Sequence, residues 1–433
     1  MRYLVTSRHL PAEEVRERCL AAGARHLRLA PLLRQVSCEL TEAGAAELSA
    51  SPGIIIRPTQ QVTTDQWRTF PDISRDTEAL QPVYAASQGS LFTMLYDLRN
   101  SVSPPVLGNN VTIIIIDTGV RSSHIGLRGK VILEENFTSS GTVADVFDHG
   151  TGVAYLLGGG IHEHGQECGV APGVKFISLK ALNDDGTGTD EDVIMALNRA
   201  LELWQAAEDA GMYHTAEMYP NGINMSFGAE DDGDPDNPIR VAIEEIWRRA
   251  GNRLVMYAAA GNAGPAPGTI MLPAAVEEVR AVGAATFQPF EVWERSSRGP
   301  TALGAVKPDM IFVGVQILTA SSASDTSFDV KSGTSFSCPV GLGLVSLLGE
   351  YSTRAGFDQQ LLEMDRAGWD VFTGIMSRKP DGAPATRDNA CGLGMPMGDL
   401  AIRALGLTPA VDIGALLGPM ALAAMMPVMM RGI

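Results

Sequence analysis

Short alternating or continuous apolar runs near the N-terminus predict a small unit of strands and helices. Strands are expected at Tyr3–Ser7, Arg25–Ala30, Arg34–Leu40 and Ile54–Ile56. Helices are expected from Pro11, as the first helical residue, to about Ala22, and over Glu42–Ala50. In this order the elements predict a ferredoxin-like α+β domain over residues 1–64. The stretch from Thr59 to about Arg75 has no clear period and is interpreted as a linker, and the segment that joins the two domains is set at 65–89.

From Val111 onward the apolar pattern changes. Val111–Ile116 is a continuous β-branched run, typical of a parallel strand buried on both faces. Further strands are expected at Val174–Leu179, Ile223–Ser226, Leu254–Ala259 and Val279–Val282. Helices are expected at Gly150–Leu157, Glu191–Ala207, Pro238–Ala250 and Val340–Leu348. Strands that alternate with helices predict an α/β domain with a mostly parallel central sheet, here over residues 90–406.

Charge and cysteine usage exclude several classes of partner. The 433 residues carry 33 Lys and Arg against 50 Asp and Glu, a net charge of −17. A surface of this sign repels polyanions, so nucleic acid is not expected as a partner. The five cysteines are scattered and form no CxxC pair, which disfavours a disulfide framework and a cysteine zinc site.

The two ends of the chain differ in character. Charged residues follow Ser7 too soon for a signal peptide, so a cytoplasmic location is expected. An apolar tail is expected at 407–433, and its residues 413–430 carry no charge. That length is at the lower limit for a membrane span, but two glycines and two prolines disfavour a continuous helix. A buried or partner-binding tail is therefore favoured over membrane contact.

Three glycine-flanked segments contain reactive residue types. They are Asp117-Thr118-Gly119, at the end of the Val111–Ile116 strand, Asp148-His149-Gly150-Thr151-Gly152, and Gly333-Thr334-Ser335-Phe336-Ser337-Cys338-Pro339. Acyl transfer by serine needs a hydroxyl, an imidazole that takes its proton, and a carboxylate that orients the imidazole. Each segment alone is weak evidence, because a strand-end Asp or a Gly-flanked His is common in turns and caps. Together they supply all three groups.

In this combination the chain resembles the subtilisin-like serine proteases, or subtilases, which carry Asp, His and Ser in this order. Further matches are Gly169–Pro172, Asn224–Gly228, Ala258–Gly264, Ser297–Pro300 and Lys307–Asp309. The resemblance covers roughly residues 90–404 and implies a subtilisin-like three-layer α/β fold. It also implies a serine endopeptidase acting on polypeptides, with Asp117, His149 and Ser335 as the triad and Asn262 as oxyanion donor.

The resemblance also assigns a substrate cleft. Its backbone-binding residues would be Gly186, Thr187, Gly188, Ser226, Phe227, Gly228 and Gly261. Phe227, Met271 and Leu272 either line an apolar specificity pocket or pack in the core, and the sequence leaves both interpretations open.

Subtilases commonly carry a ferredoxin-like propeptide, so the resemblance gives residues 1–64 a role. They would act as an intramolecular inhibitor of a zymogen that processes itself. Two alternatives remain open: a catalytically inactive protein that uses the fold for binding, and a narrow-specificity processing protease or peptide ligase.

The chain departs from the family pattern where metals are concerned. No cofactor is required by the predicted chemistry, and no metal ligands are assigned. Gly126 stands where many subtilases have a calcium-binding Asp, so a calcium site of the usual kind is not supported. His162, His164 and Cys168 lack a fourth ligand and are read as a solvated loop.

One insertion, Glu230–Asn237, is strongly acidic and adjoins the predicted cleft strand. Its oxygen ligands could bind calcium, although the match to a calcium loop is incomplete. An acidic rim that attracts basic substrates and a merely solvated loop are the other interpretations. Cys338, close to Ser335, is read as a small buried apolar residue.

Overall fold

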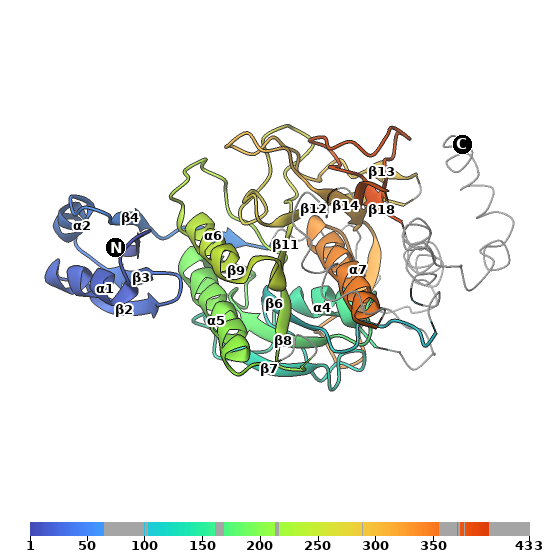
Figure 1. Ribbon diagram of the computed structural model, residues 1–433, viewed down its shortest axis with the longest axis horizontal. Helices are drawn as coiled ribbons and strands as arrows, with labels where there is room; N and C mark the ends of the chain where they lie inside the picture. The colour runs from blue at the N-terminus through green and yellow to red at the C-terminus, as the bar shows by residue number, and fades with distance from the viewer. Residues whose placement is uncertain are drawn as a thin grey trace, which may run out of the picture.

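A computed structural model describes residues 1–64, 99, 103–160, 169–212, 216–287, 289–354, 370, 373–375 and 377–397. Figure 1 shows a small N-terminal unit beside a larger body built around a sheet. The expected linker at 65–89 and the apolar tail at 407–433 lie outside the described residues, as do His162, His164 and Cys168. Within the described part of the chain, no helix combines the length and the apolar character that a membrane crossing requires.

The N-terminal unit has the predicted ferredoxin-like order. Its elements are β1 (Arg2–Thr6), α1 (Ala12–Ala21), β2 (Arg25–Ala30), β3 (Gln35–Glu39), α2 (Glu42–Ser49) and β4 (Ile55–Pro58). The antiparallel sheet has the strand order β2-β3-β1-β4. Pro11 precedes α1 as its N-cap rather than forming its first residue, because its ψ of 153° is extended. Val5, Val15 and Val36 contribute to a separate core of the unit.

The larger body is built on an eight-stranded sheet. Its strands are β6 (Thr112–Asp117), β7 (Val131–Asn136), β8 (Lys175–Lys180), β10 (Pro220–Met225), β11 (Val255–Ala259), β12 (Arg280–Thr286), β13 (Glu291–Val292) and β14 (Met310–Val313). The order is β13-β12-β11-β10-β6-β8-β7, with β14 paired to β12. All pairs are parallel except β12 with β13. The predicted mostly parallel sheet is confirmed, whereas β7, β13 and β14 are strands that the apolar pattern did not reveal.

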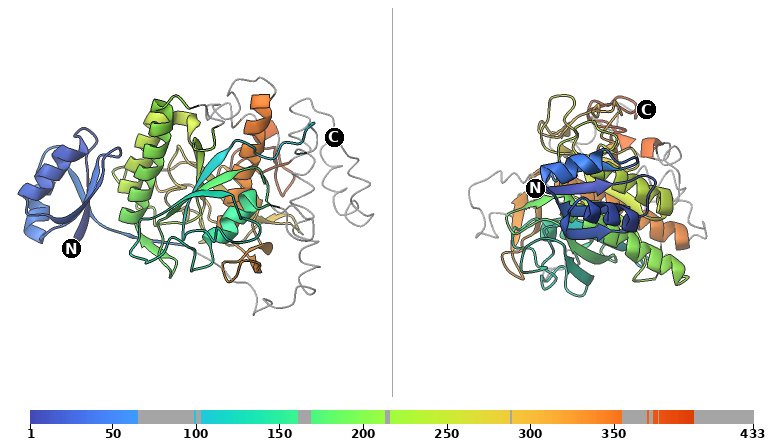
Figure 2. Two further views of the ribbon diagram at one scale, coloured as in Figure 1. Left: turned by 90° about the horizontal axis from the view of Figure 1, so that it is seen from below. Right: turned by 90° about the vertical axis from the view of Figure 1, so that its left-hand side faces the viewer.

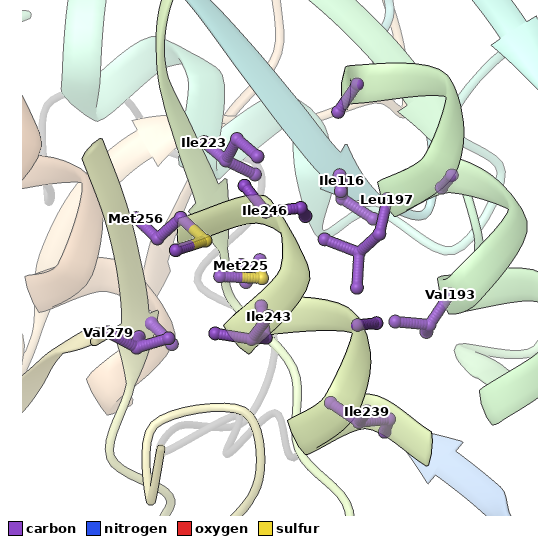
Figure 3. Packing of buried hydrophobic residues seen from close by; sticks show 14 of the residues in the cluster. Ile116, Val193, Leu197, Ile223, Met225, Ile239, Ile243, Ile246, Met256 and Val279 are labelled. Carbon is purple, nitrogen blue, oxygen red and sulfur yellow. The ribbon is translucent and has the colours of Figure 1, made fainter. Parts of the chain in front are cut away.

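Helices cover both faces of this sheet, which gives three layers. They are α4 (Gly150–Gly158), α5 (Asp190–Asp209), α6 (Pro238–Ala250), the short η1 (Gly251–Arg253) and α7 (Thr334–Arg354). On one face, side chains of α5 and α6 interleave with those of β6, β10 and β11 (Figure 3). On the other face, α4 and α7 pack in a second hydrophobic cluster. Burial from both sides explains the uninterrupted apolar run of β6.

Short strands complete the structure. β15 (Ile317–Ala320) pairs with β16 (Phe328–Lys331), and β17 (Ser377–Arg378) pairs with β18 (Met395–Pro396). β5 (Gln61–Thr63) pairs with β9 (Thr187–Thr189). The interpretation of the stretch from Thr59 as a linker is therefore wrong at β5. That strand is stabilised by partners more than 120 residues away, which local periodicity cannot reveal.

Candidate active site

The carboxyl end of β6 and the start of α4 bring Asp117 and His149 together. His149 Nδ1 lies 2.7 Å from Asp117 Oδ1, and both side chains are fully buried. The same carboxylate oxygen accepts a hydrogen bond from the Thr118 backbone N–H at 2.7 Å. A buried carboxylate on Nδ1 fixes the imidazole tautomer that leaves Nε2 able to accept a proton.

Gly150 makes this approach feasible. A Cβ added at Gly150 would overlap the carbonyl oxygen of Gly119 and lie 3.1 Å from Asp117 Oδ1. Any side chain at this position would push α4 away from the end of β6. Steric crowding therefore requires glycine directly after His149, and this explanation does not depend on the resemblance to a family.

Ser335 lies in the first turn of α7, which begins at Thr334. The neighbouring Phe336 ring packs 5.4 Å from the His149 ring, centroid to centroid, so the serine and histidine segments are adjacent. The Ser335 hydroxyl donates to the carbonyl oxygen of Ser226 at 3.1 Å. Nε2 of His149 is buried and has no hydrogen-bond partner among the described residues. The three residues are thus gathered, but the hydroxyl is bonded to Ser226 rather than to the imidazole. Catalytic hydrogen bonds are often formed only when substrate binds.

Asn262 is held in one orientation by the residue before the serine. Its Oδ1 accepts the Thr334 N–H at 2.9 Å and the Thr334 hydroxyl at 3.0 Å. Because a backbone N–H can only donate, Oδ1 must face Thr334, and the amide group Nδ2 faces the opposite way. The Thr334 hydroxyl also accepts from the Gly261 N–H at 3.1 Å. Such a fixed amide donor suits an oxyanion hole.

Asp145 is a site residue that the sequence analysis missed. Its buried carboxylate accepts from the hydroxyls of Thr118 at 2.8 Å and Thr151 at 2.6 Å, and from the His149 N–H at 3.3 Å. The segments that carry Asp117 and His149 are therefore tied through one carboxylate. The only available signal was an acidic residue four positions before the histidine.

The predicted cleft residues lie on both sides of a peptide strand, and that strand is the chain's own β5. Thr63 and Gly228 exchange both backbone hydrogen bonds, each at 3.0 Å. The Thr64 N–H donates to the carbonyl oxygen of Gly186 at 3.0 Å, and Val62 pairs with Gly188. Backbone groups of Gly186, Thr187, Gly188 and Gly228 therefore already hold an extended chain, as strand addition requires.

Of the two interpretations left open for Phe227, Met271 and Leu272, the structure favours core packing for two of the three. Phe227 is 3% exposed and Leu272 is fully buried, and both belong to the cluster beneath α5 and α6. Core packing, the alternative interpretation, therefore describes their side chains. Met271 is partly exposed and lies between Gly228 and Gly261.

The acidic insertion has arginine partners rather than an open ring of oxygen ligands. Arg57 pairs with Asp232 at 2.6 Å and also with Asp234, while Arg240 pairs with Asp231. Among the residues that the structure describes, no group of three or more His, Cys, Asp or Glu side chains is placed to hold a metal ion.

Cys338 is fully buried, and burial raises the pKa of its thiol well above the ordinary value. The thiol therefore stays protonated, in accord with its interpretation as a small core residue.

Comparison with known proteins agrees with this geometry. The model of the subtilase family matches residues 108–354, which is more than half of the chain. The chain belongs to the subtilase family. It is 31% identical over 264 residues to the serine protease AprX of Bacillus subtilis (strain 168), covering 56% of this chain and 57% of that protein. It is 28% identical over 302 residues to a subtilisin of Bacillus sp. (strain TA39), covering 65% and 67%.

Solved structures give the same fold. Fervidolysin from Fervidobacterium pennivorans, described as a keratinolytic enzyme related to subtilisin, matches with a TM-score of 0.67 at 19% identity. The match covers 93% of this chain and 60% of that one. Sphericase matches with a TM-score of 0.57 at 21% identity over 72% of this chain. The subtilisin-like three-layer architecture is thereby confirmed for the main body. AprX, in contrast, is spanned over little more than half of its length.

Proposed function

We propose that this chain is a serine endopeptidase that is made as a self-processing zymogen. Ser335 attacks a peptide carbonyl, and His149 accepts the hydroxyl proton and later donates it to the leaving amine. Asp117 orients His149 and stabilises its cation without itself taking up the proton. The Asn262 amide and the Ser335 backbone N–H donate to the oxyanion at the start of α7, where the helix dipole favours negative charge.

The observation that carries this proposal is the position of β5. Residues 61–64 occupy backbone positions that suit an extended substrate, and their partner Gly228 is two residues from Ser226, whose carbonyl oxygen accepts from the Ser335 hydroxyl. The alternative of an inactive binding protein gives no reason for an intact triad, a fixed Asn262 and a peptide strand to coincide.

The N-terminal unit is seated so as to keep β5 in this position. Figure 2 shows it as a separate lobe against the end of the body where α5 and α6 lie. Leu4, Leu33 and Val62 share one hydrophobic cluster with those helices. The Gln35 side chain also donates to the carbonyl oxygen of Pro238, at the start of α6, at 2.8 Å. An apolar interface of this kind between the N-terminal unit and the body suits an intramolecular inhibitor.

We infer the site of the proposed self-cleavage from the register of β5. Thr63 pairs with Gly228 in antiparallel fashion, so the second residue after Thr63 in a peptide of this register pairs with Ser226. Ser226 is hydrogen-bonded to Ser335 in both directions. The carbonyl of that residue is then the one that Ser335 attacks. Asp65 is the second residue after Thr63 in the sequence and lies outside the described residues; cleavage is expected after it.

Intact masses of the wild-type chain and of Ser335→Ala, expressed in parallel, test the proposal. The wild type is expected to yield fragments that begin at Met1 and Gln66, and the variant is expected to stay whole. Labelling by a fluorophosphonate probe should occur on the wild type alone. A wild type that stays whole and is never labelled, even after denaturant-assisted release of the N-terminal unit and refolding, would refute the assignment.

A further inference from the structure

Gly228 and Gly261 face each other across the side chain of Met271. A Cβ added at Gly228 would lie 2.9 Å from both Sδ and Cε of Met271. A Cβ added at Gly261 would lie 2.8 Å from Met271 Cγ and 2.9 Å from its Sδ. The space between the two glycines is therefore occupied by one thioether side chain.

This space adjoins the reacting bond. Gly228 binds the peptide strand through both of its backbone hydrogen bonds to Thr63. Gly261 directly precedes Asn262, and its N–H donates to the Thr334 hydroxyl beside Ser335. A residue whose carbonyl reaches both Ser335 and Asn262 must carry its side chain between these two backbone segments. The depth available to that side chain is set by what lies between Gly228 and Gly261.

Met271 is fixed at the base of this space by its own backbone. Its N–H donates to the carbonyl oxygen of Ala260 at 3.1 Å, on the side of Gly261. The next residue, Leu272, exchanges two hydrogen bonds of 2.9 Å with Ala229, on the side of Gly228. The main chain at Met271 thus spans both walls, so it cannot withdraw without breaking them.

We propose that Met271 closes the pocket for the residue before the scissile bond and restricts the enzyme to small side chains there. This inference rests on the proposed endopeptidase function and names its substrate class: polypeptides cleaved after small residues such as Ala, Ser or Asp, which includes the expected self-cleavage after Asp65. Bulky aromatic and aliphatic residues are rejected at this position, because Met271 occupies the volume they need. Thioether side chains are flexible, but this one lies within 3.0 Å of the positions that a Cβ would take at both glycines and so occupies the space between them.

The test compares two peptide anilides that differ only in the residue before the anilide, Ala or Phe. The wild type, Met271→Gly and the volume-conserving control Met271→Leu are expressed as full-length chains and assayed after self-processing and release of the N-terminal unit. Active enzyme is counted by fluorophosphonate labelling of Ser335. A difference of even one methylene group in an apolar pocket corresponds to about 10- to 200-fold in kcat/KM.

The wild type and Met271→Leu are expected to prefer Ala over Phe by at least about tenfold in kcat/KM. In Met271→Gly, kcat/KM for Phe should rise by roughly 10- to 100-fold while that for Ala stays within a few-fold. Labelled enzymes with equal Ala-to-Phe ratios in the wild type and Met271→Gly would overturn the pocket assignment alone. A wild type whose Ser335 is not labelled would overturn the endopeptidase function, and the pocket assignment with it.

Discussion

The pairing of Glu191 with two arginines of the N-terminal unit predicts how firmly the cleft is blocked. Glu191 is 4% exposed in its side chain and accepts from Arg2 at 2.6 Å and Arg28 at 2.9 Å. Removal of one partner from a buried ion pair costs about 3–5 kcal/mol, and from an exposed pair about 0–1 kcal/mol. Because the arginines are about one-third exposed, Glu191→Gln should cost about 2 kcal/mol, or roughly 30-fold in the opening equilibrium.

The rate of fluorophosphonate labelling of Ser335 measures this equilibrium, since the probe reacts only when the cleft is open. Glu191→Gln should be labelled about 30-fold faster than the wild type. Glu244→Gln is the matched control, because its pair with Arg8 joins two side chains that are both more than one-third exposed. The control should change the rate by less than about fivefold. Equal acceleration in both variants would refute the reasoning from burial, and an unchanged rate in Glu191→Gln would refute the role of this pair.

The difference in labelling rate between the wild type and Glu191→Gln should disappear at acidic pH. Burial alone would raise the pKa of Glu191, but the hydrogen bond from Arg2 and the charge of Arg28 outweigh it and lower the pKa. A lowered pKa in the docked state means that the stabilisation is fully present above the ordinary value of 4.5 and is lost as the pH falls through the lowered value. The labelling rates of the wild type and Glu191→Gln should therefore converge well below pH 4.5.

Three further changes test other parts of the structure. Asn262→Ala should lower kcat by about 10²–10³-fold with little change in KM, because the oxyanion donor acts mainly in the transition state. An unchanged kcat with a raised KM would contradict this role. Gly150→Ala should reduce kcat at least about tenfold by forcing His149 away from Asp117, and unchanged turnover would refute the steric reasoning. Burial raises the pKa of Asp190 to about 7 from 3.8, so its charged form destabilises the fold above pH 7 and this penalty disappears as the pH falls toward 4. In urea titrations, the double variant Ser335→Ala/Asp190→Asn should therefore have a free energy of unfolding up to about 4 kcal/mol higher than that of Ser335→Ala at pH 8. If this difference does not shrink toward pH 4, the raised pKa of Asp190 is contradicted.

Much of the fold could be predicted because strands that are buried on both faces have uninterrupted runs of apolar residues. β6 reads as an uninterrupted apolar run, and α6 spans the predicted residues Pro238–Ala250. β7 was missed because it ends in Glu134, Glu135 and Asn136 and is only half-buried along its length. β14 has four residues and draws its stability from pairing with β12. Strands of this kind depend on partners that local periodicity does not report.

In the candidate site too, some residues could be predicted from local sequence and others depend on distant parts of the chain. Asp117, His149 and Ser335 stand at ends of β6, α4 and α7, where glycine-flanked motifs mark them in the sequence. Asp145 acts through five hydrogen bonds, from the hydroxyls of Thr118 and Thr151 and from the backbone N–H groups of Asp148, His149 and Thr151. Its immediate sequence does not distinguish it from a surface acid. Met271 was recognised as a pocket candidate, but whether it opens or fills the pocket depends on two glycines that approach it from separate segments.

Under the proposed function, inhibition and substrate binding use the same backbone groups. Gly228 and Gly186 are bonded to Thr63 and Thr64, so a peptide substrate can bind only when β5 leaves. Cleavage of one bond after β5 removes no contact between the N-terminal unit and the body: the cluster containing Leu4, Leu33 and Val62 and the arginine pairs all persist. A substrate must then compete with β5, which these contacts hold at high effective concentration beside the cleft. Under the proposed function, release of the N-terminal unit rather than bond cleavage is therefore the step that sets the onset of activity.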